Sequence, residues 1–147
     1  MGSKLGLDCK LYRNTGTYEA PTWSEVSCVK DVTLNLEKGE ADVTTRANQG
    51  WKASKAALKD ASIEFDIMWD TSDVGFVALK DAFMNNTTLE MAVMDGSIAT
   101  VGSEGLRATV EVMKFPRNEP LEEAVTVSVA LKPTYAAHPP EWMKIAA

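Results

Sequence analysis

The residues that could do chemistry in this chain are few and scattered. Its single histidine, His138, stands beside Pro139-Pro140, and no second histidine or nearby cysteine completes a zinc ligand set. No nucleophile elbow, phosphate-binding loop or dinucleotide fingerprint occurs in the sequence. Gly96, Gly102 and Gly105 fit turns between strands better than a phosphate cradle. The sequence therefore predicts neither a metal nor a cofactor.

Carboxylates are the remaining candidates for catalysis. Glu64 and Asp66 are two residues apart and would share one face of a strand, which could supply half of a metal or acid/base site. A solvated or partner-facing strand surface is the alternative interpretation of the same pair. Asp70 and Asp73 flank a helix start, where acids are favoured for capping alone. Because none of these acids converges with a base, we predict that the chain is not an enzyme.

Charge and hydropathy exclude further classes. The 147 residues include 21 acidic and 15 basic side chains, a net charge of −6, which lacks the basic footprint of a protein that grips phosphate backbones. An acidic surface still suits a wall to which DNA must not adhere. No apolar stretch is long enough for a membrane span or a signal peptide. We expect a cytoplasmic protein without membrane partners, in which Cys9 and Cys28 are free thiols.

The elements that must position these residues are mostly strands. Apolar residues alternate with polar ones, as in a strand with one face on a core. The alternating stretches are 5–11, 32–36, 63–69, 89–93, 106–112 and 125–131. This pattern predicts a mainly β, antiparallel fold.

One segment predicts a helix. Ser72-Asp73 has the composition of a helix start, with Ser72 as the capping residue and an acid in the first turn. Phe76, Leu79 and Phe83 follow at three- and four-residue spacing, and Asn85-Asn86 fits a helix end. We expect this helix to lie across the core face of the sheet.

Two regions do not fit a core. Residues 37–59 are polar, with Gly39 and Gly50 flanking the middle section and Trp51 beside it. A connection of this length is usually functional or disordered. Part of it, around Val43, could form a short strand or protruding hairpin. Residues 134–147 are expected to form an extended tail.

With these elements in order, the chain resembles the tail tube (major tail) proteins of long-tailed bacteriophages, which are related in fold to type VI secretion tube proteins. The stretches that carry the resemblance are 31–46 with Gly50-Trp51, 58–65, 79–83, 94–96 and 115–124. Together they extend over about nine-tenths of the chain.

The resemblance implies a single domain, 1–147, with an antiparallel β-sandwich or rolled sheet, one flanking helix and a long loop after the second strand. It implies a structural virion protein whose hexameric rings stack into a hollow tube through which DNA passes into the host. Residues 37–59 would then be the inter-ring assembly loop. Its expected contact residues are Glu40, Asp42, Arg46 and Trp51, and the possible lumen-facing acids are Glu64, Asp66 and Glu111.

The resemblance also implies partners and a location. Besides copies of itself, the chain would meet tail tip, tape measure and tail terminator proteins, and DNA would pass without specific binding. It would reside in the virion tail after assembly in the host bacterial cytoplasm.

An alternative from another class is a monomeric β-sandwich ligand-binding module, directed at a carbohydrate or a peptide. Trp23, Trp51 or Trp142 would supply its aromatic platform.

Overall fold

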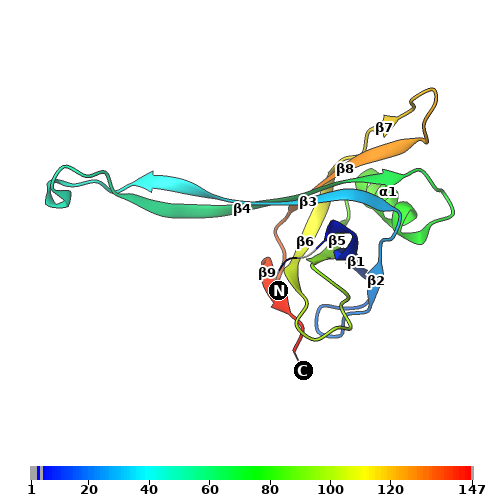
Figure 1. Cartoon of the computed structure of the whole chain (residues 1–147), viewed down its shortest axis with the longest axis horizontal. Coiled ribbons are helices and arrows are strands. Elements are labelled where there is room, and N and C mark those ends of the chain that lie inside the picture. Colours follow the sequence, from blue (N-terminus) through cyan, green and yellow to red (C-terminus); the bar gives the residue numbers. More distant parts are fainter. Residues whose placement is uncertain (1–2, 4, 147) are drawn as a thin grey trace.

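The computed structural model describes residue 3 and residues 5–146. They form one curled nine-stranded sheet, antiparallel at every pairing, with one α-helix against it (Figure 1). The strands are β1 (Lys10–Asn14), β2 (Trp23–Glu25), β3 (Val29–Asp42), β4 (Ser54–Met68), β5 (Thr88–Met94), β6 (Glu104–Lys114), β7 (Arg117–Asn118), β8 (Thr126–Pro133) and β9 (Glu141–Lys144). The helix α1 spans Val74–Asn85, and two 3-10 turns span Gly6–Asp8 (η1) and Arg46–Asn48 (η2). The predicted fold class, mainly β with one flanking helix, is confirmed.

The strand order brings distant parts of the chain together. Along the sheet it is β2-β1-β5-β6-β8-β4-β3, with β7 added to β8 and β9 added to β6. The curl lets the two halves of the sheet enclose the main core, and α1 closes it by packing against β6. The fully buried residues of that core are Leu11, Ile63, Ile67, Phe76, Leu79, Met91, Val110, Val127, Val129 and Leu131. Apart from Phe76 and Leu79 on α1, these are inward positions of the alternating stretches, and their burial drives the fold.

The N-cap of the helix lies one residue later than expected. Asp73, not Ser72, is the N-cap, because its side chain accepts a hydrogen bond from the backbone N–H of Phe76 at 2.9 Å. Ser72 instead donates its hydroxyl and its backbone N–H to Asp70 Oδ1, at 2.6 and 3.0 Å. The helix ends as expected, with Asn86 in the left-handed region at φ 55°.

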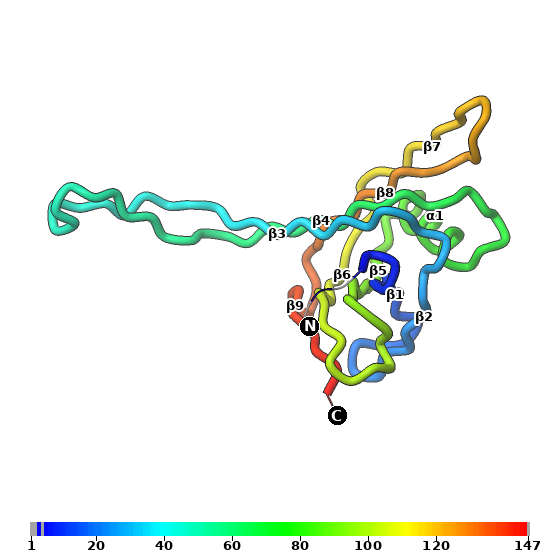
Figure 2. The backbone as a smooth tube through the Cα atoms, in the orientation of Figure 1, coloured from blue at the N-terminus to red at the C-terminus, as the bar shows by residue number. Residues whose placement is uncertain are grey.

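Residues 37–59 are strand at both ends. β3 and β4 pair from Val29 opposite Ile67 to Asp42 opposite Ser54, so only residues 43–53 lie outside the ladder. The paired part beyond residue 36 and these residues form a projecting hairpin, which we call the arm (Figures 1 and 2). We expected this segment after the second strand. It follows the third strand, β3, because the short strand β2 lies between β1 and β3. The alternation that marks other strands is missing here because both faces of the arm are exposed.

The C-terminal tail contains a strand. β9 pairs with Glu104–Arg107 of β6, the half of β6 that β8 does not reach. In the same half of β6, Gly105 is a strand residue and not a turn glycine. A Cβ added at Gly105 would lie 1.8 Å from the backbone oxygen of Val93, so β5 and β6 approach too closely for any other residue.

Candidate assembly surfaces

The end of the arm, residues 43–53, is held by short-range hydrogen bonds, and we call it the arm tip. The N–H of Val43 donates to the carbonyl of Ala53 at 3.0 Å, and the N–H of Ala53 donates to Thr44 Oγ1 at 2.8 Å. Asp42 Oδ1 accepts from the N–H of Thr44 at 2.9 Å, and the hydrogen bonds from the Thr44 side chain and backbone lower the pKa of the Asp42 carboxyl. The arm tip is therefore a defined turn and not a random loop.

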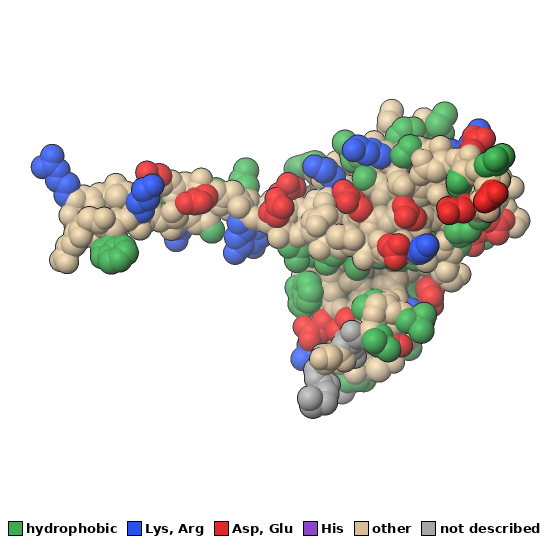
Figure 3. Space-filling model, turned by 45° about the horizontal axis from the view of Figure 1, so that its top comes forward, with side chains coloured by type: hydrophobic (Ala, Val, Ile, Leu, Met, Phe, Trp, Pro, Cys, Tyr) green, Lys and Arg blue, Asp and Glu red, His purple; other side chains and the backbone are tan. Residues whose placement is uncertain are grey.

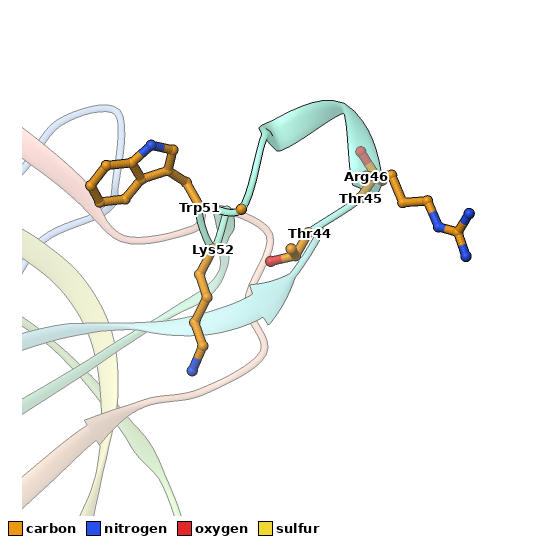
Figure 4. Close-up of a pocket in the computed structure, with 6 residues that line it drawn as sticks. Thr44, Thr45, Arg46, Trp51 and Lys52 are labelled. Carbon is orange, nitrogen blue, oxygen red and sulfur yellow. The ribbon is translucent and has the colours of Figure 1, made fainter.

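The four residues expected to make inter-ring contacts lie in two different situations. Trp51 is 79% exposed at the arm tip, and Arg46 is exposed there too. Figure 4 shows their side chains pointing away from each other around a shallow hollow, so they do not converge as a catalytic pair would. Glu40 and Asp42 are also exposed but carry hydrogen bonds within the arm, Glu40 from Ser54 Oγ at 2.5 Å. Arg46 and Trp51 are thus the side chains of this set that are free to reach a partner.

A second surface is the non-core face of β6, β8, β4 and β3. Glu64 lies opposite Ala130, and Asp66 lies opposite Ser128, whose hydroxyl donates to Asp66 Oδ1 at 2.9 Å. Glu111 of β6 lies on the same face. The register therefore brings together the three acids expected to face a lumen.

The same face also carries lysines that sequence reasoning did not consider. Lys132 lies opposite Glu111, and Lys30 lies opposite Asp66. Lys114 and Glu64 lie on the two sides of Ala130, on β6 and β4. Opposite charges on facing positions of neighbouring strands attract. The face is therefore mixed in charge. The pairing of these lysines with the acids depends on the strand register, which could not be predicted from the sequence.

A third surface is the outer edge of β3. This 14-residue strand is last in the sheet order, so within the described part of the chain its outer backbone groups have no neighbouring strand. Exposed edges of this length are templates for pairing with another chain.

Comparison with known families decides between an assembly protein and a ligand-binding module. Residues 9–135 match the family described as phage tail tube protein. The chain belongs to this family. Among curated proteins, none matches the chain.

Solved structures agree with the tail tube fold. A subunit from the tail of an empty gene transfer agent particle, refined with C6 symmetry, superposes with a TM-score of 0.73 at 13% identity, covering 98% of this chain and 100% of that one. The SPP1 tail tube gives a TM-score of 0.72 at 14% identity, covering 99% and 81%. A chain from the baseplate of the anti-feeding prophage gives 0.63 at 6% identity, covering 99% and 98%. At these identities the similarity concerns the fold.

The tail tube protein also contains a buried ionic cluster that the sequence did not reveal. Arg107 of β6 is 8% exposed, pairs with Glu90 of β5 and donates Nη2 to the carbonyl of Tyr18 at 2.7 Å. Its guanidinium lies 3.9 Å from the centre of the Tyr18 ring. His138 stacks on the same ring at 3.6 Å, and Tyr18 donates its hydroxyl to Glu141 at 2.6 Å, a bond that raises the pKa of the tyrosine. The cluster fastens the C-terminal tail onto the sheet.

The tryptophans of the tail tube protein do not form one aromatic platform. Trp51 is at the arm tip, far from Trp23 on β2 and Trp142 on β9 (Figure 1). Trp23 packs partly buried beneath Arg107, and Trp142 donates its indole N–H to Glu104 at 2.9 Å. Residues 3 and 5–146 contain no cluster of three potential metal ligands. Over the same residues, no helix is long and apolar enough to cross a membrane.

Proposed function

We propose that this tail tube protein is the repeating subunit of a hollow tail tube, built from rings of six copies stacked along one axis. Family membership and the C6-symmetric tail with the same fold support this assembly. The observation that carries the proposal is the arm. Beyond residue 36 it extends for about 20 Å of paired strand, and its side chains have no body of the same subunit to pack on.

In the proposed tube the arm reaches a neighbouring ring, and the arm tip makes the contact. Trp51 and Arg46 belong to the residue types that anchor protein interfaces, and both are exposed at the arm tip. Asp42 and Glu40 hold the hairpin in shape through their bonds to Thr44 and Ser54.

The non-core face forms the lumen wall on the same proposal. Glu64, Asp66 and Glu111 face the passing DNA, and the neighbouring lysines limit their repulsion of phosphate. The tube meets tail tip, tape measure and tail terminator proteins at its ends and interior. It is assembled in the host cytoplasm, carries no cofactor and catalyses no reaction.

The first test is electron microscopy of the purified protein over a concentration series, with light scattering on the same samples. We expect hollow tubes of uniform width. A variant in which Asn-Gly replaces residues 43–53 joins the facing residues Asp42 and Ser54 by a two-residue hairpin turn. It is expected to keep the wild-type circular dichroism spectrum and to form no tubes. A wild-type protein that stays monomeric even on an added tail-tip template contradicts the proposal.

A matched pair of tryptophan variants tests the arm tip more finely. Trp51→Ala is expected to weaken assembly, whereas Trp142→Ala, on the body, is expected to leave it unchanged. Equal effects of the two changes would remove the special role of the arm tip.

The lumen assignment has its own test. Glu64→Cys, in a chain that also carries Cys9→Ser and Cys28→Ala, is expected to react in assembled tubes with a small maleimide but not with a long polyethylene glycol maleimide. Reaction with both reagents would place Glu64 on the outer surface.

A further inference from the structure

Two successive rungs of the arm carry like charges directly opposite each other. Glu37 of β3 faces Asp60 of β4, and the next residues, Lys38 and Lys59, also face each other. Facing residues of an antiparallel pair project from the same side of the sheet, and successive residues alternate sides. One face of the arm therefore presents two carboxylates, and the opposite face presents two ammonium groups at the same level.

This arrangement is unfavourable in the isolated subunit. Like charges directly opposite on neighbouring strands destabilise the pairing. All four side chains are exposed, and within the described residues none of them forms an ion pair within 4.0 Å. The nearest acid toward the arm tip, Glu40, is hydrogen-bonded to Ser54. An arm selected only for its own stability would place Lys opposite Glu or Asp at these rungs.

The two pairs complement each other. We propose that the acidic pair Glu37/Asp60 of one copy binds the lysine pair Lys38/Lys59 of a second copy, arm against arm. Each carboxylate then lies near a lysine of the other copy, and each lysine lies near a carboxylate. Association therefore reduces the repulsion within the acidic pair and the repulsion within the lysine pair. The space-filling view shows that acidic and basic side chains are accessible along the arm (Figure 3).

The geometry also determines the kind of contact. Because the two pairs lie on opposite faces, one arm can use both at once, its acidic face toward one neighbour and its lysine face toward another. Such a contact joins different surfaces of identical copies, and contacts of this kind generate closed rings or continuous filaments. A two-fold contact of one face with itself would bring like charges together. This inference rests on the proposed tube and names a partner surface within it.

The test uses two charge-reversed variants of the full chain. Lys38→Glu/Lys59→Glu makes both faces acidic, and Glu37→Lys/Asp60→Lys makes both faces basic. Alone, each variant is expected to yield at least about tenfold less sedimentable polymer than wild type, because like charges across an interface are strongly unfavourable. An equimolar mixture of the two is expected to restore polymer in which both variants are present. The chain with all four changes keeps the wild-type net charge of −6 and is expected to assemble alone.

A single reversal separates this role from ordinary stability. Lys59→Glu places opposite charges on one rung, so the monomer is expected to unfold at the same or higher urea concentration while its assembly decreases. Loss of stability and assembly together would contradict the inference. Lys80→Glu/Lys144→Glu, on α1 and β9, is the control for net charge and is expected to assemble as wild type.

The outcomes distinguish the inference from the proposed function. If wild type forms tubes and both reversed variants also form them, the arm-to-arm contact is wrong and the tube remains. If the variants fail alone and also fail when mixed, the two pairs do not bind each other. Failure of the net-charge control would assign the losses to overall charge instead.

Discussion

The thiol of Cys28 donates a hydrogen bond to Asp73 Oδ2, with 3.2 Å between Sγ and the oxygen. The same carboxylate oxygen accepts the backbone N–H of Phe76 and so caps the first turn of α1. Cys28 directly precedes β3, the strand that leads into the arm. One carboxylate therefore connects the start of the helix to the start of β3.

The cap itself can be tested by Asp73→Ala. Loss of an N-cap acceptor is expected to lower the free energy of unfolding by about 1–2 kcal/mol. Ser72→Ala, which removes only an exposed bond to Asp70, is expected to change it by less than about 0.5 kcal/mol. Urea unfolding curves followed by circular dichroism measure both. Equal losses would return the capping role to Ser72.

The thiol predicts a specific pH dependence. Burial, followed by the hydrogen bond to Asp73, raises the pKa of Cys28 from 9.0 to about 12. The folded protein then holds this proton more tightly than the unfolded chain. The contribution to stability is complete below the unfolded pKa and is lost as pH rises from about 9 toward about 12.

Urea unfolding midpoints measured at about pH 8 and about pH 10.5 test this dependence. Wild type is expected to lose more stability between them than Cys28→Ala, which has no thiol to titrate. Identical losses in both proteins would show that Cys28 is not the group responsible.

The helix offers a matched pair of aromatic variants. Phe76 is fully buried against Trp69 and Phe115, whereas Phe83 is 38% exposed. Phe76→Ala is expected to cost about 3–5 kcal/mol through the cavity it leaves, and Phe83→Ala only about 1–2 kcal/mol. Denaturant melts compare the two. A larger loss at Phe83 would mean that the helix presents a different face to the core.

Gly105 predicts intolerance of any side chain. Since an added Cβ would meet the Val93 carbonyl at 1.8 Å, Gly105→Ala is expected to cost at least about 2 kcal/mol by forcing β5 and β6 apart. Gly6→Ala is the control, because no atom lies within 4 Å of a Cβ there. Thermal melts of the two variants should differ clearly; similar melting temperatures would show that the β5–β6 pair adjusts without cost.

The sequence by itself determined the parts of this protein that depend on local pattern. The alternation at Ile63, Phe65 and Ile67 predicted a strand with one buried face, because side chains alternate across a strand wherever it lies. The three-residue spacing of Phe76 and Leu79 predicted which face of the helix packs on the core, because residues at this spacing lie on one side of any helix. The family resemblance rested on the order of such elements and on short stretches between them.

The tertiary structure decided what depends on pairing between distant residues. Nothing local to Lys38 or Lys59 indicates that they face each other, and nothing near Arg107 indicates its contacts with Glu90 and Tyr18. The arm is strand because its backbone groups pair across the hairpin, while its side chains, exposed on both faces, leave no hydrophobic period to read. Register is set by the sheet as a whole, and it is register that places the charges of this protein.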